Sequence, residues 1–157
     1  MKVLKDRHIL SKKGSGLILV MILVFFLVTF IVTVGEFYRI HILQQDIETH
    51  LQRTVNSTVE YSMIDSYRQD KRTELDVGLA RNRFLPFLRV DMRLDNQNRR
   101  KSNGGLSYTL YFTSVNGTSN PAVFTVKGYA KAQSLFTFLV GEIEIPFEIS
   151  STNFRTD

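Results

Sequence analysis

The sequence predicts an α+β fold in which a long N-terminal helix begins in a membrane and then packs on a small antiparallel sheet. Three observations support this prediction. Positions 17–34 form an uncharged run, apolar residues recur every three or four positions from 37 to 63, and the last third of the chain alternates apolar and polar residues. The first two patterns are typical of a helix and the third of strands.

The run Leu17–Val34 is the predicted membrane span. Fifteen of its 18 residues are Leu, Ile, Val or Phe, and none is Gly or Pro. As a helix it would be about 27 Å long, close to the hydrocarbon thickness of a bilayer. A buried core helix and a cleaved secretory signal are the alternatives. The signal is disfavoured because its apolar core is normally about 7–15 residues long, and because residues 34–37 contain no small-x-small cleavage site.

The charge on either side of this run predicts its orientation. Residues 1–16 contain five basic residues and one acidic residue, a net charge of +4, whereas the other 141 residues contain 15 basic and 14 acidic groups. Lys and Arg beside a spanning helix stay in the cytoplasm. We therefore expect a cytoplasmic tail at 1–16, a transmembrane helix at 17–34 and an extracytoplasmic remainder, a single-pass arrangement in the cell membrane.

The helix is expected to continue beyond the membrane through residues 35–67, as one rod from about Leu17 to Tyr67. No Gly or Pro interrupts positions 37–77, and one apolar stripe runs along this part. The members of the stripe are Phe37, Ile40, Leu43, Ile47, Leu51, Val55, Val59 and Met63. We expect the stripe to cover the chain's own domain. A parallel coiled coil is the alternative, although the steps do not keep a strict heptad.

Residues 68–157 are predicted to form one small α+β domain. After a charged connection, a short helix is expected from about Thr73 to Leu85. Pro86 opposes an uninterrupted helix because it lacks the backbone N–H. Residues 86–95 fit either a continuation of the helix beyond a kink or a strand. The polar segment 96–105 is expected to be a loop.

The C-terminal third is expected to be antiparallel sheet. Three segments alternate apolar and polar residues, and they are Leu106–Thr113, Phe124–Ala132 and Glu142–Ile149. Asn116-Gly117 and Asn120-Pro121 should supply the turn between the first two strands. The segment Leu135–Val140 has no alternation and fits a buried strand, a loop docked on the core or a contact with the membrane.

The sequence contains no motif for catalysis. A phosphate-binding loop, His-Glu-x-x-His and Gly-x-Ser-x-Gly are all absent, and there is no Cys. His41 and His50 are nine residues apart, which does not suit a metal pair on one helix face. Both are expected to be ordinary residues of the polar face of the helix. Glu142 and Glu144 share a strand face and could pair as carboxylates, but an outer charged face that deters edge pairing is the favoured interpretation. We expect no enzymatic activity, no metal site and no cofactor.

The candidate binding region is basic. Residues 81–101 contain seven basic and two acidic residues, a net charge of +5, and Arg99, Arg100 and Lys101 are consecutive. One interpretation is an anion-binding patch for DNA, polysaccharide or acidic lipid. The other is a solvated loop, which is the favoured interpretation. Aromatic interleaving, which single-strand binding would require, is absent from the loop 96–105 itself.

The order of these parts resembles the TadE-like pseudopilins, minor components of tight-adherence pili and related type IV filament systems. The resemblance covers most of the chain and is strongest over residues 12–65. Its elements are the tail Lys12-Lys13-Gly14, the apolar helix, Gly35-Glu36-Phe37, the long amphipathic helix and the final strand IPFEISS. It implies a pilin-like fold and a non-enzymatic membrane-anchored subunit. The implied partners are membrane lipid, other pilin-like subunits and assembly-platform proteins, with nucleic acid less favoured.

The resemblance also implies a processing site. In that superfamily a prepilin peptidase cuts after a Gly on the cytoplasmic side, and Gly14 and Gly16 are the candidates. A Glu commonly follows five residues after the cut, where this chain has Leu19 or Met21. We therefore expect a minor or basal component of a type IV or Tad-type pilus or a related secretion assembly, with the tail retained rather than cleaved. The alternative is an anchored extracytoplasmic module that binds DNA or glycan through residues 81–101.

Overall fold

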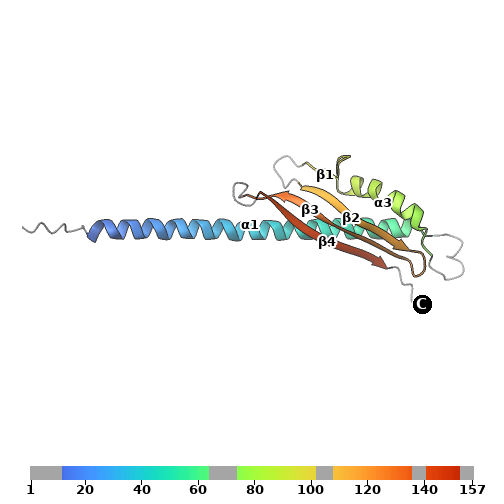
Figure 1. Ribbon diagram of the computed structural model, residues 1–157, viewed down its shortest axis with the longest axis horizontal. Helices are drawn as coiled ribbons and strands as arrows, with labels where there is room; N and C mark the ends of the chain where they lie inside the picture. The colour runs from blue at the N-terminus through green and yellow to red at the C-terminus, as the bar shows by residue number, and fades with distance from the viewer. Residues whose placement is uncertain (1–11, 64–73, 102–107, 136–140, 153–157) are drawn as a thin grey trace, which may run out of the picture. The chain divides into compact units, whose positions relative to one another are not determined.

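The computed structural model describes residues 12–63, 74–101, 108–135 and 141–152 (Figure 1). The chain divides into two compact units, residues 1–39 and 40–157. The described elements are α1 (Lys12–Tyr61), α3 (Val77–Asp91), β1 (Arg99–Arg100), β2 (Tyr108–Thr118), β3 (Val123–Gln133) and β4 (Glu142–Thr152). The fold is α+β, as the sequence predicts.

The first unit contains the apolar half of α1. Its most apolar window of 18 residues has a mean hydropathy of 3.3, and none of that window is buried. The hydroxyls of Thr29 and Thr33 donate hydrogen bonds to the backbone oxygens of Phe25 and Thr29, at 2.9 and 2.8 Å. These two polar groups are therefore satisfied within their own helix. By length and composition the segment fits a single-pass membrane anchor.

In the second unit, the C-terminal half of α1 and helix α3 cover one face of the sheet. The predicted stripe on α1 enters the core through Leu43, Ile47, Leu51, Val55 and Val59. From α3 come Ala80, Phe84 and Leu88, which are fully buried. The ring of Phe84 lies 5.6 Å from that of Phe112 and 5.8 Å from that of Phe124, centroid to centroid. Both helices thus share one core with β2 and β3.

The four strands are antiparallel and lie in the order β1-β2-β3-β4. The predicted alternation is confirmed on β3 and β4, where Phe124, Val126, Ile145, Phe147 and Ile149 are buried. Leu106 and residues 136–140 lie outside the described residues, and Leu135 is 59% exposed.

The predicted turn between β2 and β3 is shorter than expected. Asn116 and Gly117 lie inside β2, where they pair with Thr125 and Phe124. Of the two predicted turn signals, Asn120-Pro121 is the one that lies between β2 and β3. The peptide bond between these two residues is cis. The turn signal of Asn-Gly is overridden because the backbone of β2 stays paired with β3 as far as Thr118, which lies opposite Val123 at the start of β3.

Helix α1 ends earlier than predicted, at Tyr61 rather than Tyr67. The backbone N–H of Ser62 donates to the oxygens of Thr58 and Val59, and Met63 then forms an antiparallel bridge with Leu75. This bridge requires an extended backbone, so the chain leaves the helix before it. Residues 64–67 lie outside the described part of the chain.

The predicted start of α3 is wrong, and of the two alternatives for residues 86–95 the continuation of the helix is confirmed as far as Asp91. The helix starts at Val77 because Asp76 is its N-cap, with Oδ1 accepting from the backbone N–H of Leu79 at 2.9 Å. It continues through Pro86 to Asp91, so a strand at 86–91 is excluded. A proline inside a helix costs about 3 kcal/mol. Burial of Phe84 and Leu88 on either side of it offsets this, at about 1.5–3 kcal/mol for each side chain.

Gly128 is required where β3 faces the bulge of β2 between Phe112 and Ser114. A Cβ atom on Gly128 would overlap the backbone oxygen of Tyr111 and lie 2.8 Å from Cζ of Phe147. We expect Gly128→Ala to lower the free energy of unfolding by about 1–3 kcal/mol, because the packed core cannot yield to the added methyl group. Urea unfolding of the full chain in detergent micelles, followed by circular dichroism, measures this change.

Gly117→Ala is the matched control for this prediction. Its Cβ would lie 3.1 Å from Cδ2 of Phe124, a contact that a small movement relieves. It should therefore cost less than Gly128→Ala, and equal losses from the two variants would contradict the packing argument.

Candidate functional site

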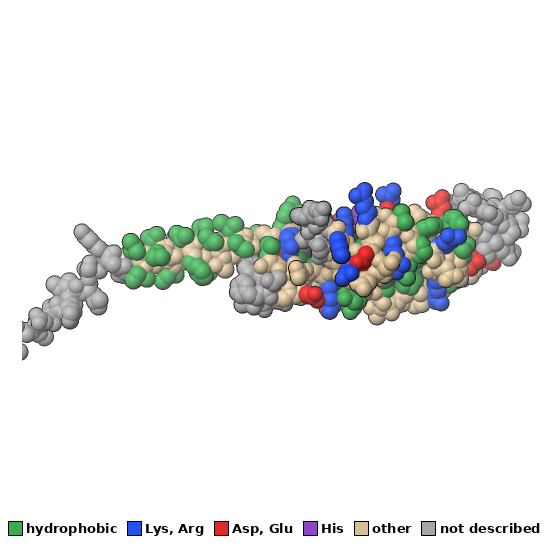
Figure 2. Space-filling view, turned by 90° about the horizontal axis from the view of Figure 1, so that it is seen from above, with side chains coloured by type: hydrophobic (Ala, Val, Ile, Leu, Met, Phe, Trp, Pro, Cys, Tyr) green, Lys and Arg blue, Asp and Glu red, His purple; other side chains and the backbone are tan. Residues whose placement is uncertain are grey.

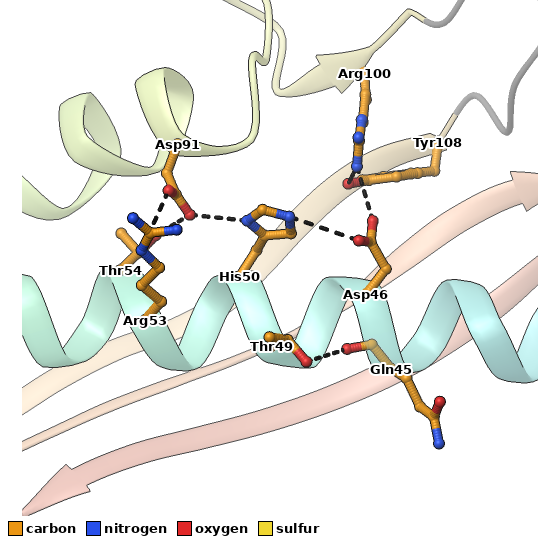
Figure 3. A network of polar contacts seen from close by, with 9 residues as sticks. All are labelled: Gln45, Asp46, Thr49, His50, Arg53, Thr54, Asp91, Arg100 and Tyr108. Atoms are coloured by element: carbon orange, nitrogen blue, oxygen red, sulfur yellow. Dashed lines mark hydrogen bonds and ion pairs between the residues drawn. The ribbon is translucent and has the colours of Figure 1, made fainter.

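A network of polar side chains joins α1 to α3, β1 and β2 in the second unit (Figure 3). Its centre is His50, whose Nδ1 lies 3.0 Å from Oδ2 of Asp91 and whose Nε2 lies 3.6 Å from Oδ1 of Asp46. Asp46 and His50 are one helical turn apart on α1, which places them on the same side of the helix. Asp91 is the last residue of α3. The imidazole therefore links the end of α3 to the middle of α1.

Two more side chains of α1 hold the same carboxylate. The hydroxyl of Thr54 donates to Oδ2 of Asp91 at 3.4 Å, and Nε of Arg53 lies 3.8 Å from Oδ1. Thr54 is buried, whereas Arg53 is exposed. Asp91 is thus contacted by three residues of α1, which fixes the C-terminal end of α3.

The other end of the network holds β1 and β2. Nη1 of Arg100 donates to Oδ2 of Asp46 at 2.8 Å and to the phenol oxygen of Tyr108 at 3.2 Å. The Arg100 guanidinium also lies 5.8 Å from the centre of the Tyr108 ring. Burial raises the pKa of the Tyr108 phenol, and the hydrogen bond with Tyr108 raises the pKa of Arg100. The phenol therefore stays protonated and the guanidinium charged.

The hydroxyl of Thr54 in this network is not paired with the imidazole. It is bonded to a carboxylate instead, so it is not a nucleophile paired with a base. Among the described residues, no three His, Asp or Glu side chains are placed to hold a metal ion. The arrangement instead works as a polar clasp, and we use the name polar clasp for Asp46, His50, Asp91, Arg100 and Tyr108.

No protein-family model, curated protein or solved structure matches this chain. The features of this chain that bear on its function are its apolar helix, its fold and its surface chemistry.

The structure separates the three cations of the predicted anion patch. In β1, Arg99 and Arg100 are neighbours on a strand, and neighbouring side chains of a strand point to opposite faces. Nε of Arg99 donates to Oδ2 of Asp95 at 3.0 Å, while Arg100 belongs to the polar clasp. Lys101 is exposed. A binding role for this trio stays a prediction, but two of its charges already have a carboxylate partner.

Asp95 accepts hydrogen bonds from the backbone of the turn that leads into β1. Its Oδ1 accepts the backbone N–H groups of Arg99 and Gln97, at 2.9 and 2.8 Å. These contacts, led by the backbone N–H of Arg99, lower the pKa of the Asp95 carboxyl. The carboxylate therefore stays charged and holds the start of β1 in place.

The candidate processing residues Gly14 and Gly16 both lie within α1. Apart from its chain neighbours and the backbone of its own helix, no described atom lies within 4 Å of the position that a Cβ on Gly16 would take. Cleavage after either glycine stays a prediction.

The outer face of the sheet carries paired charges. Lys131 Nζ lies 3.1 Å from Oε1 of Glu144, and Lys127 Nζ lies 2.7 Å from Oε1 of Glu148. Glu142 and Glu144 are both exposed, as expected for an outer charged face. The hydrogen bond from Lys131 to Glu144 raises the pKa of the lysine. These pairs occupy the solvent side of β3 and β4 and form no carboxylate dyad.

An open groove of about 620 Å³ runs beside α1. Its lining is mainly the polar face of that helix, including Glu48, Gln52, Asn56 and Glu60, with Ile149 of β4. Nε2 of Gln52 bridges the two elements by donating to the backbone oxygen of Ser150 at 3.4 Å. The groove is shallow and polar, unlike the mostly apolar pockets that enclose small ligands.

Sequence reasoning missed the role of His50, which it placed on the polar surface of the helix. The spacing of Asp46 and His50 could have indicated their contact, because i and i+4 residues meet on a helix. No local signal indicates Asp91, which is 41 residues away.

The ion pair of Asp46 and Arg100 can be measured by a double-mutant cycle. We expect Asp46→Ala and Arg100→Ala each to destabilise the second unit, with a coupling energy of about 1 kcal/mol, since both side chains are partly exposed. Urea unfolding of both single variants and the double variant gives this value. Asp46→Ala combined with Arg99→Ala is the control, and it should be additive because Arg99 contacts Asp95. Additivity for Asp46 and Arg100 would contradict the clasp.

The buried Tyr108 phenol should ionise later than an ordinary tyrosine. Its raised pKa means that the folded protein holds this proton more tightly than the unfolded chain does. The resulting stability is present below the unfolded pKa of about 10 and is lost as the pH rises through the raised value. An absorbance titration should show a late component that Tyr108→Phe removes and Tyr111→Phe retains. A late component that survives Tyr108→Phe would contradict this assignment.

Proposed function

We propose that this protein is a membrane-anchored, non-enzymatic, pilin-like subunit of the TadE-like kind. It would serve as a minor or basal component of a type IV or Tad-type pilus or of a related secretion assembly. The observation that carries this proposal is α1, one helix of 50 residues. Its first half is apolar and exposed, whereas its second half supplies the core of an antiparallel sheet unit. A chain built in this way is suited to assembly through an anchor and a displayed domain.

The orientation proposed for the anchor follows from charge. The five basic residues before the span favour a cytoplasmic N-terminus. After the span, Nε and Nη2 of Arg39 donate to the two carboxylate oxygens of Glu36, at 2.8 and 3.0 Å. This pair keeps the second flank close to neutral. The asymmetry therefore favours the second unit on the extracytoplasmic side.

The basic tail favours a basal role over a filament role. Extraction of the helix into a filament would bring the tail's basic side chains into an apolar bundle unless they were removed or paired. Leu19 and Met21 stand where a regular filament subunit commonly has Glu. A retained tail is compatible with a subunit that remains in the bilayer, where lateral packing of the span would hold it beside its partners.

Reporter fusions test the proposed orientation. A reporter enzyme that is active only outside the cytoplasm should be active when fused after Asp157 and inactive when fused before Met1. The reason is the positive tail, so replacing its five basic residues by Gln should weaken this preference. A cytoplasmic C-terminus in the unaltered chain would refute the proposed function.

Intact-mass spectrometry of the same native protein tests the basal role. We expect the full-length chain in membrane extracts and little of it in sheared filaments. A chain that begins at Ser15 or Leu17 and is recovered in sheared filaments would replace the basal role with that of a filament subunit.

A further inference from the structure

Helix α3 and the turn after it carry four arginines that contact no carboxylate of the described residues. These are Arg81, Arg83, Arg89 and Arg93. Within residues 12–63, 74–101, 108–135 and 141–152, none of the four lies within 4 Å of a carboxylate oxygen. The one acidic residue of α3, Asp91, is already occupied by His50, Thr54 and Arg53.

Four other described cations of the second unit are compensated. Arg99, Arg100, Lys127 and Lys131 each contact a carboxylate at 2.7–3.1 Å. Among the described residues, the arginines of α3 and of the turn after it therefore stand out as a group of cations without such a contact. Figure 2 looks onto the side of the second unit that carries α3 and shows Lys and Arg side chains spread over this face, with a few Asp and Glu between them.

Neutral partners hold three of the four arginines in place. Nη2 of Arg81 donates to Oδ1 of Asn116 at 3.2 Å, and the Arg83 guanidinium lies 5.4 Å from the centre of the Tyr61 ring. Arg89 donates to Oδ1 of Asn98 and to the backbone oxygen of Asn96, at 3.3 and 3.2 Å. These contacts orient the guanidinium groups without neutralising them, which lowers the entropy lost when an anion binds.

An exposed apolar side chain follows Arg89 directly and precedes Arg93 by three residues. Val90 is 81% exposed, the most exposed of the large apolar side chains described. Pro86, also exposed, precedes it by one helical turn and so lies on the same side of α3. Protein interfaces are enriched in Arg, and an apolar centre in them is enclosed by a polar rim. An exposed apolar residue beside arginines is therefore typical of such a surface.

We propose that these residues form a docking surface for an acidic segment of a partner protein. We name it the α3 arginine face and define it as Arg83, Arg89 and Arg93 with Pro86 and Val90. Carboxylates of the partner bind the planar guanidinium groups, which match them in a two-point geometry. An apolar side chain of the partner covers Val90.

Nucleic acid fits this surface less well. Phosphate contacts explain the arginines but leave the exposed Val90 and Pro86 without a role, whereas an acidic peptide with apolar residues uses both features. The inference rests on the proposed function only for the expectation that the partner belongs to an assembly. The docking chemistry itself stands independently of the membrane orientation.

Peptide binding to the full-length protein tests the proposal. The protein is placed in nanodiscs of neutral phosphatidylcholine, and the probe is a fluorescent synthetic peptide of repeated Glu-Glu-Leu units. Fluorescence anisotropy should show salt-sensitive binding that Arg93→Glu weakens by about tenfold. Lys101→Glu makes the same charge change outside the face and should have an effect of less than about twofold. Circular dichroism confirms that each variant retains the fold.

Two comparison probes test the chemistry. A peptide of Gln-Gln-Leu units should not bind, and Val90→Ser should weaken the binding of Glu-Glu-Leu units but not that of Glu-Glu-Ser units. Absence of binding by the unaltered protein, equal binding of the Gln peptide, or equal effects of Arg93→Glu and Lys101→Glu would overturn the proposal. So would tighter binding of a DNA duplex of equal charge, which would assign the surface to nucleic acid.

The result is separable from the test of the proposed function. Arg93→Glu should leave the reporter orientation unchanged, because the tail and the span are intact. Peptide binding with a cytoplasmic C-terminus would refute the pilus role and retain the docking surface. An extracytoplasmic C-terminus without peptide binding would refute the docking surface and leave the proposed pilus role standing.

Discussion

Burial of the inner face of the sheet is the constraint on which the second unit depends. Within the described residues the sheet has four strands, and β1 contributes two residues to it. Its apolar face would be open to water without a cover. The stripe from Leu43 to Val59 supplies that cover along α1, and all five of its members are nearly inaccessible to solvent. The helix that is suited to hold the protein in a membrane therefore also contributes five residues to the core, and the second unit begins within it at Ile40.

The second helix needs a different kind of attachment. Helix α3 has only three fully buried residues and contains a proline, so its apolar contacts alone are modest. The polar clasp adds a fixed point at its C-terminal end, where Asp91 meets His50, Arg53 and Thr54. Through Asp46 and Arg100 the same set of contacts reaches β1. The clasp thus positions the outer side of α3, and with it the arginines that remain available to a partner.

The sequence was informative wherever one local pattern determined the structure. The spacing of Ile47 and Leu51 predicted the covering stripe, and the alternation around Val126 and Phe147 predicted the inner face of the sheet. It was less informative where distant residues decide the outcome. Pro86 breaks an isolated helix but is tolerated where Phe84 and Leu88 are buried on both sides. Two residues are too few to show the alternation of a strand, so the sequence predicted a loop at Arg99 and Arg100, where the structure has β1. Asp91, the second carboxylate that contacts His50, is 41 residues away in the sequence, too far for any periodicity to reveal it.

The pairing of β3 with β4 contains a safeguard against misalignment. A shift of one residue would turn Glu144 and Glu148 into the core and expose Ile145 and Phe147. A shift of two residues keeps the faces but separates Lys127 from Glu148, placing it opposite Pro146 or Ser150. The same shift removes the large ring of Phe147 from opposite Gly128, the site without a side chain, and sets it against a residue that has one. Charge and volume therefore select the same alignment independently, which gives a strand at the end of a small sheet a single stable register.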